Sequence, residues 1–186
     1  MMMNENYLIN IARDAIAEVF ENRRILDNDA LLREHPELRR QAATFVTLEL
    51  NHSLRGCIGS LLARRSLLED VISNAKAAAF DDPRFVPLSR EEFDSPTFRI
   101  EISLLSEPKA LHYENITALY EHIRPKIDGV ILKHGMHQAT YLPQVWEQLP
   151  QVEDFLASLC QKAGMQGDCL KYFPEIYTYE VKKIPI

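Results

Sequence analysis

The chain has 186 residues, of which 46% are hydrophobic and 26% are charged, so it can bury a substantial core in one domain or two closely packed lobes. Its formal net charge of −6 at pH 7 argues against a broadly basic surface, and no apolar run approaches the roughly 20 residues that cross a bilayer. We therefore expect neither nucleic acid nor a membrane as a partner.

Hydrophobic periodicity and turn residues divide the first half of the chain into helices and strands. We predict a helix that ends near Glu21, a short helix over 29–34, strands over 43–50 and 54–59, and a helix over 66–80. Ser66 and Glu69 form a capping-box pattern at the start of the last of these helices, and Pro83 follows its end.

The second half of the chain mixes strands and short helices without a regular βαβ pattern. We predict a capped helical turn at Ser89, a strand over 97–105, a helix over 115–123, paired strands over 128–133 and 138–142, a helix over 152–163, a loop over 167–174 and a closing strand over 176–184. Strands joined by hairpins and interspersed with helices indicate the α+β class with a largely antiparallel sheet.

The three cysteines, at positions 57, 160 and 169, make an odd count without a C-x-x-C motif. This favours reduced thiols over a disulfide framework or a zinc site, with Cys160 as a core residue and Cys169 as a loop residue without a partner. The first residues lack the basic and apolar regions of a secretory signal. Together these features predict a cytoplasmic protein.

A thiol, a guanidinium and two glycines occur within the six residues Leu54–Gly59. Side chains alternate along a strand, so we expect Arg55 and Cys57 to share one face, roughly 7 Å apart at Cα. A nearby guanidinium favours the thiolate, which is the form that acts as a nucleophile. The structural alternative is a buried cysteine beside an arginine that pairs with Glu49 or Glu101.

Five further residues are candidates for substrate binding. Gly56 and Gly59 weaken a strand unless a ligand or another backbone approaches closely. Asp82 and Arg84 follow a helix end, where the guanidinium could hold a carboxylate or phosphate in a bidentate fork or, alternatively, the two side chains could order a turn. The hydroxyl of Thr140 could bind a substrate or simply lie on an exposed strand face.

Histidines give weaker signals. His52 is the histidine closest in sequence to Cys57 and could act as a general base, although its turn position favours a solvated side chain. His134 and His137 flank a glycine turn without a third ligand nearby, so we expect no metal site. Phosphate-loop, dinucleotide-binding, nucleophile-elbow and cluster-binding motifs are absent from the sequence, and we expect no cofactor.

An ordered series of motifs spans most of the chain: Phe45–Leu48, Leu54–Gly59, Asp82–Phe85 with Pro87–Leu88, Glu101–Leu105, Asp128–Val130, Ala139–Val145 and Leu159–Gly164. In this order they resemble the AMMECR domain family, whose bacterial and archaeal members are called AmmeMemoRadiSam system protein A. The resemblance implies a single AMMECR-type domain over residues 4–186 with a two-lobed fold. Both chain ends would form the larger lobe around an antiparallel sheet, and the middle would form a smaller sheet-containing lobe.

The resemblance also implies a system that includes a Memo-type protein and a radical S-adenosylmethionine protein, but it implies no established reaction. One hypothesis is a thiol-dependent enzyme that acts on a small anionic or carbonyl substrate at a cleft between the lobes. Cys57 and Arg55 would then be catalytic, and Arg84 and Thr140 would line the cleft. The other hypothesis is a non-catalytic module that docks a Memo-type partner or a modified peptide, because the sequence shows no complete catalytic constellation.

Overall fold

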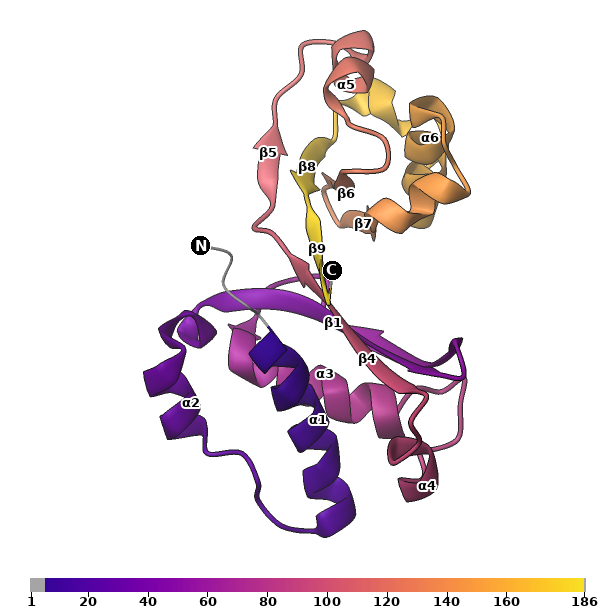
Figure 1. Ribbon diagram of the computed structural model, residues 1–186. Helices are drawn as coiled ribbons and strands as arrows, with labels where there is room; N and C mark the ends of the chain where they lie inside the picture. The colour runs from indigo at the N-terminus through magenta and orange to yellow at the C-terminus, as the bar shows by residue number, and fades with distance from the viewer. Residues whose placement is uncertain (1–5, 186) are drawn as a thin grey trace. The chain divides into compact units, whose positions relative to one another are not determined.

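The computed structural model describes residues 6–185, whose helices and strands fall into two compact units. The first unit comprises Met1–Leu105 and Lys182–Ile186, and the second comprises Ser106–Val181. The chain leaves the first unit after β4 (Phe98–Leu105) and returns to it through β9 (Val181–Ile184), as Figure 1 shows. The predicted α+β class with antiparallel sheets is confirmed.

The first unit contains an antiparallel sheet in the order β2-β1-β4-β9. Strand β1 (Gln41–Leu50) pairs with β2 (Ser53–Gly59) on one side and with β4 on the other. Asn51 and His52, between β1 and β2, both have the positive φ of a tight hairpin turn. A two-residue strand that we did not predict, β3 (Arg65–Ser66), pairs with the start of β1.

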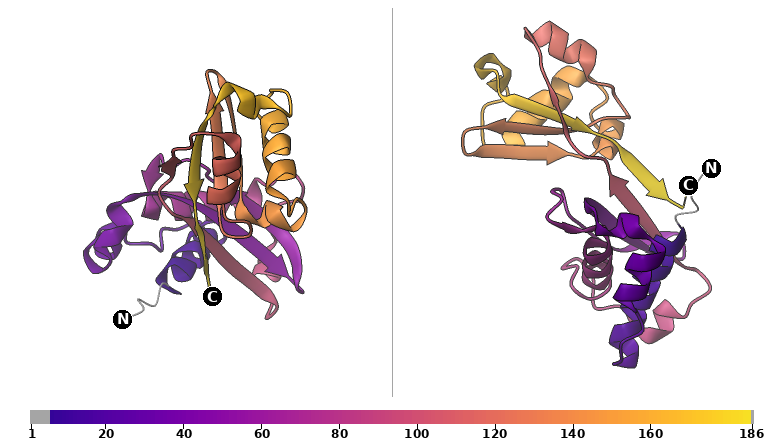
Figure 2. Two further views of the ribbon diagram at one scale, coloured as in Figure 1. Left: turned by 90° about the horizontal axis from the view of Figure 1, so that it is seen from above. Right: turned by 90° about the vertical axis from the view of Figure 1, so that its left-hand side faces the viewer.

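Helices α1 (Asn6–Glu21) and α3 (Leu67–Phe80) cover one face of this sheet (Figures 1 and 2). Their apolar stripes form one core with inward-facing residues of β1 and β4. The capping boxes predicted at Ser66 and Ser89 are both present, and they begin α3 and α4 (Arg90–Phe93). The first unit also contains α2 (Asn28–Glu34) and the 3₁₀ helix η1 (Pro36–Arg39).

The second unit has a four-stranded antiparallel sheet in the order β5-β8-β6-β7. Its elements are β5 (Lys109–Leu111), α5 (Ile116–His122), β6 (Gly129–His134), β7 (His137–Tyr141), η2 (Pro143–Glu147), α6 (Val152–Lys162), η3 (Cys169–Tyr172) and β8 (Glu175–Tyr179). Trp146 lies in the core of this unit, where it stacks on Phe155 with 3.7 Å between ring centroids. Its indole Nε1 donates to the carbonyl oxygen of Asp128 at 2.7 Å, so the one polar atom of this buried ring is satisfied.

Two predictions about the C-terminal part are wrong. The single strand predicted over 176–184 is two strands in different sheets, β8 and β9, because the chain changes sheet at Glu180, whose N–H donates to Ser106 Oγ at 2.8 Å. Cys169, predicted to have no partner, forms a disulfide with Cys160, and their Cα atoms are 5.8 Å apart. Helix η3 returns the chain to the last turn of α6, so two of the three cysteines are not reduced thiols.

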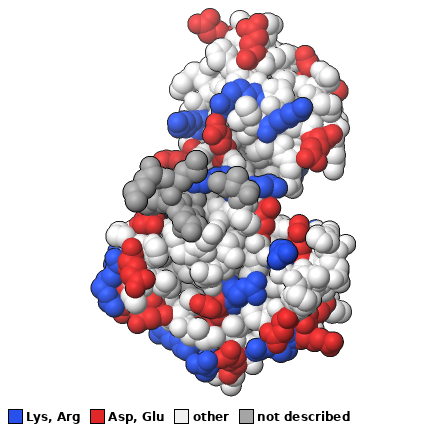
Figure 3. Space-filling view, in the orientation of Figure 1, with Lys and Arg blue, Asp and Glu red and all other residues white. Residues whose placement is uncertain are grey.

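No helix among residues 6–185 is long and apolar enough to cross a membrane. On the face shown in Figure 3, acidic and basic side chains are interspersed over each unit. That face therefore carries no continuous basic surface of the kind that binds a nucleic-acid backbone.

Candidate functional site

Cys57 lies on β2 directly opposite Thr47 of β1. Its sulfur is 3.3 Å from Thr47 Oγ1, which is within hydrogen-bonding distance for sulfur. The neighbours of Thr47 on β1, Val46 and Leu48, are buried in the core, so Thr47 and Cys57 occupy the opposite face of the sheet. Cys57 is partly exposed and is the free cysteine of the chain.

Asp82 and Arg84 together bind both backbone groups of Cys57. The buried carboxylate of Asp82 accepts the N–H of Cys57 at 2.9 Å, and Arg84 Nη2 donates to the carbonyl oxygen of Cys57 at 3.3 Å. The two side chains also pair, because Arg84 donates from Nε to Asp82 Oδ1 at 3.0 Å and from Nη2 to Oδ2 at 2.7 Å. Since β2 is the outer strand of the sheet, this pair takes the place of a neighbouring strand at Cys57.

The electrostatics of this pair hold a charged guanidinium at the backbone carbonyl of Cys57. Hydrogen bonds from Arg84, helped by the N–H of Cys57, hold the pKa of Asp82 well below its usual range. Asp82 in turn raises the pKa of Arg84, with a smaller contribution from negative charge on Cys57. The side chain of Arg84 is 55% exposed, and its Nη1 has no acceptor within residues 6–185. One N–H edge of the guanidinium therefore remains for another acceptor.

We predicted from regular alternation that Arg55 shares the face of Cys57, but the two strands are not in regular register at Arg55. The pairing places Leu54 and Gly56 opposite consecutive residues of β1, which leaves Arg55 as the extra residue of a β-bulge. A bulge interrupts the alternation of side chains that the prediction assumed.

The side chain of Arg55 is buried in an ion pair with Glu92, not with Glu49 or Glu101. Its Nε and Nη2 each donate to one carboxylate oxygen of Glu92 at 2.9 Å, and Nη2 also donates to the carbonyl oxygen of Val86 at 2.9 Å. The hydrogen bonds from Arg55 lower the pKa of Glu92 to about 2. Arg55 therefore ties the segment before α4 to β2.

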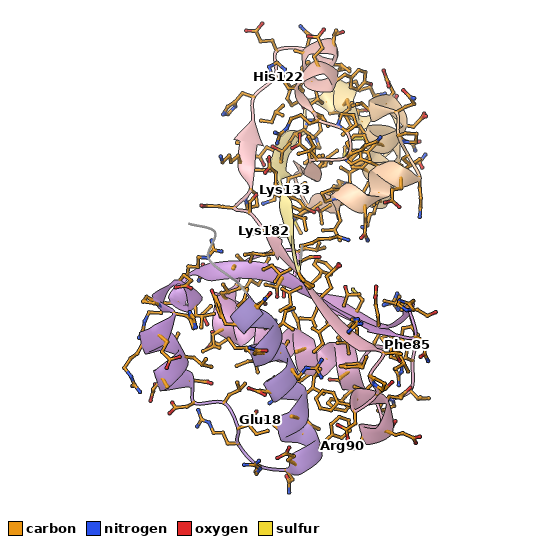
Figure 4. All side chains as sticks on the ribbon, viewed as in Figure 1. Glu18, Phe85, Arg90, His122, Lys133 and Lys182 are labelled. Carbon is orange, nitrogen blue, oxygen red and sulfur yellow. A yellow bond between two sulfur atoms is a disulfide. The ribbon has the colours of Figure 1, made fainter. Side chains whose placement is uncertain are left out.

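Phe85, labelled in Figure 4, lies within cation–π distance of two arginines. The Cζ atoms of Arg84 and Arg55 are 5.5 and 5.7 Å from its ring centroid. Each guanidinium is also paired with a carboxylate, so the two ion pairs have no net formal charge. This differs from the electropositive setting that we predicted for Cys57.

At both glycines of β2, another part of the first unit packs closely against the strand. A Cβ atom at Gly56 would overlap the carbonyl oxygen of Ala78 in α3, and one at Gly59 would overlap the ring of Phe45. Strand β2 therefore lies against a helix backbone at Gly56 and under an aromatic ring at Gly59. Any role of these glycines in substrate binding would come in addition to this packing.

Thr140 makes its contacts within the second unit. Its Oγ1 is 3.1 Å from Tyr179 Oη, and that phenol donates to the carbonyl oxygen of Tyr141 at 3.1 Å. Because the phenol has a single proton, Thr140 is the donor to Tyr179. The hydroxyl of Thr140 is left with acceptor capacity only.

The histidines lie apart from any metal-binding group. His52 is exposed in the β1–β2 turn, and His134 and His137 pair at the end of the β6–β7 hairpin. His137 Nδ1 is 2.9 Å from the carbonyl oxygen of Ala163, so it acts as a donor there. Residues 6–185 contain no group of three or more His, Cys, Asp or Glu side chains that could hold a metal ion.

We did not predict the buried polar cluster that lies at the start of β1. Asp70 of α3, only 1% exposed, accepts hydrogen bonds from Thr44 N and Oγ1 at 2.8 Å, from Ser60 Oγ at 2.7 Å and from Arg65 Nη2 at 2.8 Å. Asn74, one turn further along α3, donates to the carbonyl oxygen of Thr44 at 3.0 Å. The cluster fixes the segment after β2 to α3 and β1. The spacing of Asp70 and Asn74 on an otherwise apolar helix face is the signal that could have found it.

The fold and this site define an α+β protein that carries a free thiol on an outer strand, held at its backbone by an aspartate–arginine pair. The AMMECR1 family model matches residues 9–184, and the chain belongs to this family. The family membership predicted from the sequence motifs is thereby confirmed.

Archaeal relatives and a solved structure agree with this assignment. A protein of Methanothermobacter thermautotrophicus is 37% identical over 178 residues, which cover 92% of this chain and 88% of that protein. A protein of Sulfurisphaera tokodaii is 41% identical over 181 residues, with coverages of 90% and 76%. The crystal structure of an uncharacterised protein from Pyrococcus horikoshii matches with a TM-score of 0.75 and 32% identity, covering 96% of this chain and 89% of that chain.

Proposed function

We propose that this AMMECR1-family protein is a thiol-dependent enzyme whose nucleophile is Cys57 and whose substrate is a small molecule with a carbonyl group. The proposal is carried by the arrangement of three side chains. The guanidinium of Arg84 binds the backbone of Cys57, and the sulfur of the same residue contacts Thr47 Oγ1. Thr47, which we did not single out from the sequence, thus becomes part of the candidate site.

Each side chain has a defined part in such a reaction. The thiol of Cys57 loses its proton to solvent, its sulfur forms a bond to the carbonyl carbon, and the carbonyl π electrons move to the oxygen. The remaining N–H edge of Arg84 stabilises that oxygen, and the hydroxyl of Thr47 donates to the thiolate before attack. Asp82 and Arg55 are positioning residues. Asp82 orients Arg84, and Arg55 holds the segment around Val86, before α4, against β2.

The charge balance favours an uncharged carbonyl substrate over an anionic one. Asp82 neutralises Arg84 and Glu92 neutralises Arg55, so the cluster provides no net positive charge to attract an anion. Asp82 also occupies the Nε and Nη2 side of the Arg84 guanidinium. The side-on fork that grips a carboxylate or phosphate is therefore already in use.

The test is the rate at which iodoacetamide alkylates Cys57 in the folded full-length chain at about pH 7, divided by the rate for the same variant unfolded in urea. Under non-reducing conditions alkylation reports one thiol, because the other two cysteines form a disulfide. We expect Arg84→Gln and Thr47→Val each to lower this ratio by about threefold to tenfold.

The matched control for the alkylation experiment is Arg90→Gln. Arg90 is a half-exposed arginine that pairs with Asp94 and does not contact Cys57. This variant should alkylate like the wild type. If Arg84→Gln and Thr47→Val also alkylate like the wild type, the cluster does not activate the thiol and the enzymatic proposal fails.

A second candidate is a non-catalytic module that docks a Memo-type protein or a modified peptide. Among residues 6–185, no histidine or carboxylate hydrogen-bonds the sulfur of Cys57, so no general base is in place to take its proton. This favours a docking function over catalysis. A radical S-adenosylmethionine protein in the same system would supply any radical chemistry.

Co-purification of the full-length chain with the Memo-type protein tests this second candidate. We expect the two proteins to co-elute in size-exclusion chromatography. Loss of co-elution in Cys57→Ser, with an unchanged far-UV circular dichroism spectrum, would place the thiol in the interface. Separate elution of the two wild-type proteins at high concentration would rule the docking function out.

A further inference from the structure

The second unit exposes large apolar and aromatic side chains, and two of them stack on a neighbouring ring. Met136 at the end of the β6–β7 hairpin is 99% exposed, Tyr172 at the end of η3 is 54% exposed, and Phe173 is 56% exposed. His134 stacks with Tyr172 at 6.1 Å between ring centroids, and Tyr113 stacks with Phe173 at 5.9 Å. We call these five residues the aromatic surface. The two stacks are joined because Tyr172 and Phe173 are adjacent in the chain, and Met136 lies in the same hairpin as His134.

The backbone that presents this surface is held in an unusual conformation. Phe173 has φ 49° and ψ 57°, in the left-handed region that a bulky side chain rarely adopts. The hydroxyl of Tyr113 donates to the carbonyl oxygen of Pro174 at 2.6 Å, and the disulfide anchors the start of η3 at Cys169. The strained position directs Phe173 outward instead of into the core, and strain of this kind concentrates at functional sites.

The charge of the second unit indicates what this surface binds. Residues 106–181 contain six Lys and Arg residues and ten Asp and Glu residues, which gives a formal net charge of −4. Lys171, beside Tyr172, is already paired with Asp168 at 2.8 Å. Glu114, which follows Tyr113 in the sequence, and Glu175, two residues after Phe173, are both exposed. A basic partner is therefore electrostatically complementary to this region.

We propose that the aromatic surface docks a protein segment that presents arginine side chains among apolar ones. The planar guanidinium group stacks on aromatic faces, and Tyr, Phe, Met and Arg are the residues enriched at protein interfaces. The proposed docking uses none of the residues of the Cys57 cluster, so it is independent of the enzymatic function proposed above.

The experiment is isothermal titration calorimetry of the full-length chain with two synthetic peptides. One peptide alternates arginine and leucine, and the other has glutamate in place of each arginine. We expect the arginine peptide to bind and the glutamate peptide not to bind. Equal binding of both peptides, or no binding of the arginine peptide, would overturn the proposal.

Three variants locate the binding on the molecule. Tyr172→Ala and Phe173→Asn should each weaken binding of the arginine peptide by about thirtyfold, as the loss of a central aromatic anchor does. Ile127→Ala, which truncates an apolar side chain of the same unit that is 48% exposed, should bind like the wild type. Phe173→Asn should not lower the melting temperature, because asparagine tolerates the left-handed conformation, and this separates loss of binding from loss of folding.

Two results would assign the surface differently. Wild-type affinity in both Tyr172→Ala and Phe173→Asn would show that the peptide binds elsewhere. Sedimentation velocity that shows a dimer of the wild type, dissociated by the same two substitutions, would make a second copy of this chain the occupant. Either result would overturn the proposal of an arginine-presenting partner.

Discussion

The two units fix the segments that border their sheets with different chemistry. In the first unit charged side chains do this: Asp70 binds the segment after β2, and Asp82 with Arg84 binds the outer strand itself. In the second unit a disulfide joins η3 to α6, and the core is built around the stacked rings of Trp146 and Phe155. The first unit therefore relies on buried carboxylates that are hydrogen-bonded and ion-paired, whereas the second relies on the oxidation of two cysteines.

Between paired strands, however, both units pack an aromatic ring against a glycine of the neighbouring strand. In each sheet an aromatic ring covers the glycine directly opposite it, Phe45 over Gly59 and Tyr179 over Gly129. A Cβ atom at either glycine would overlap the ring, so each ring can occupy its position only because its partner is glycine. The difference between the units therefore lies in how loops are fixed and not in how strands pair.

Trp146 allows the two units to be followed separately during unfolding. It is the single tryptophan of the chain and lies buried in the second unit, so its fluorescence reports on that unit. Far-UV circular dichroism reports on both units. Urea denaturation followed by both signals therefore tests whether the two units are stabilised by different interactions.

The largest expected effect is that of Asp70→Asn on the first unit. The substitution removes the negative charge that faces Arg65 and places an amide against several donors, so we expect the free energy of unfolding of this unit to fall by about 3–5 kcal/mol. The measurement is the circular dichroism transition in urea. Asp94→Asn, which breaks a half-exposed ion pair with Arg90, should lower the free energy of unfolding far less than Asp70→Asn does. Equal effects of the two substitutions would show that burial of the Asp70 cluster contributes nothing.

Loss of the disulfide should affect the second unit next most strongly. The bond links cysteines nine positions apart, and we expect the double substitution Cys160→Ser with Cys169→Ser to lower the stability of this unit by about 2–3 kcal/mol. The urea midpoint of Trp146 fluorescence should fall, and dithiothreitol should shift the wild type in the same direction. Cys57→Ser is the control and should leave that midpoint unchanged. An unchanged fluorescence midpoint in the double variant would show that the disulfide does not stabilise the second unit.

The smallest of the three expected effects is the acid dependence that the Arg55–Glu92 pair gives the first unit. The pKa of Glu92 is lowered to about 2 in the folded chain, and that of Asp82 is also lowered. As pH falls from about 4.5 to about 2, the unfolded state takes up protons before the folded state does, so stability present above about 4.5 is progressively lost.

Glu92→Gln tests this acid dependence. At neutral pH the variant should be less stable by roughly 2 kcal/mol, because Arg55 loses its charged acceptor. Its stability should then vary less with pH than that of the wild type over the same interval, as measured by urea midpoints from circular dichroism. An identical pH dependence in the two proteins would show that Glu92 does not cause the loss of stability in acid.

Local signals in the sequence predicted most of the fold. The capping boxes at Ser66 and Ser89 and the alternating residues of β4 each act over a few neighbouring residues, and each prediction matched the structure. The sequence analysis chose Cys57 as one candidate and Asp82 with Arg84 as another, and the structure joins these three residues by hydrogen bonds.

The parts that could not be predicted depend on long-range pairing or on register. Asp70 binds Thr44, which lies 26 residues away, and neither residue alone indicates the other. The bulge at Arg55 is a one-residue shift of register that leaves no signal in the composition, and the partner of Arg55, Glu92, lies 37 residues away in the sequence. The disulfide was missed because Cys160 looked like an ordinary residue of a helix core.

The carboxylate at position 82 has a consequence for the behaviour of the chain in concentrated solution. An outer strand with free N–H and C=O groups is a template on which strands of other molecules can add, leading to aggregation. At Cys57 both groups are occupied, and the low pKa of Asp82 keeps its carboxylate ionised at neutral pH. Removal of Asp82 would therefore open this strand to intermolecular sheet growth, so the residue that orients the arginine also protects solubility.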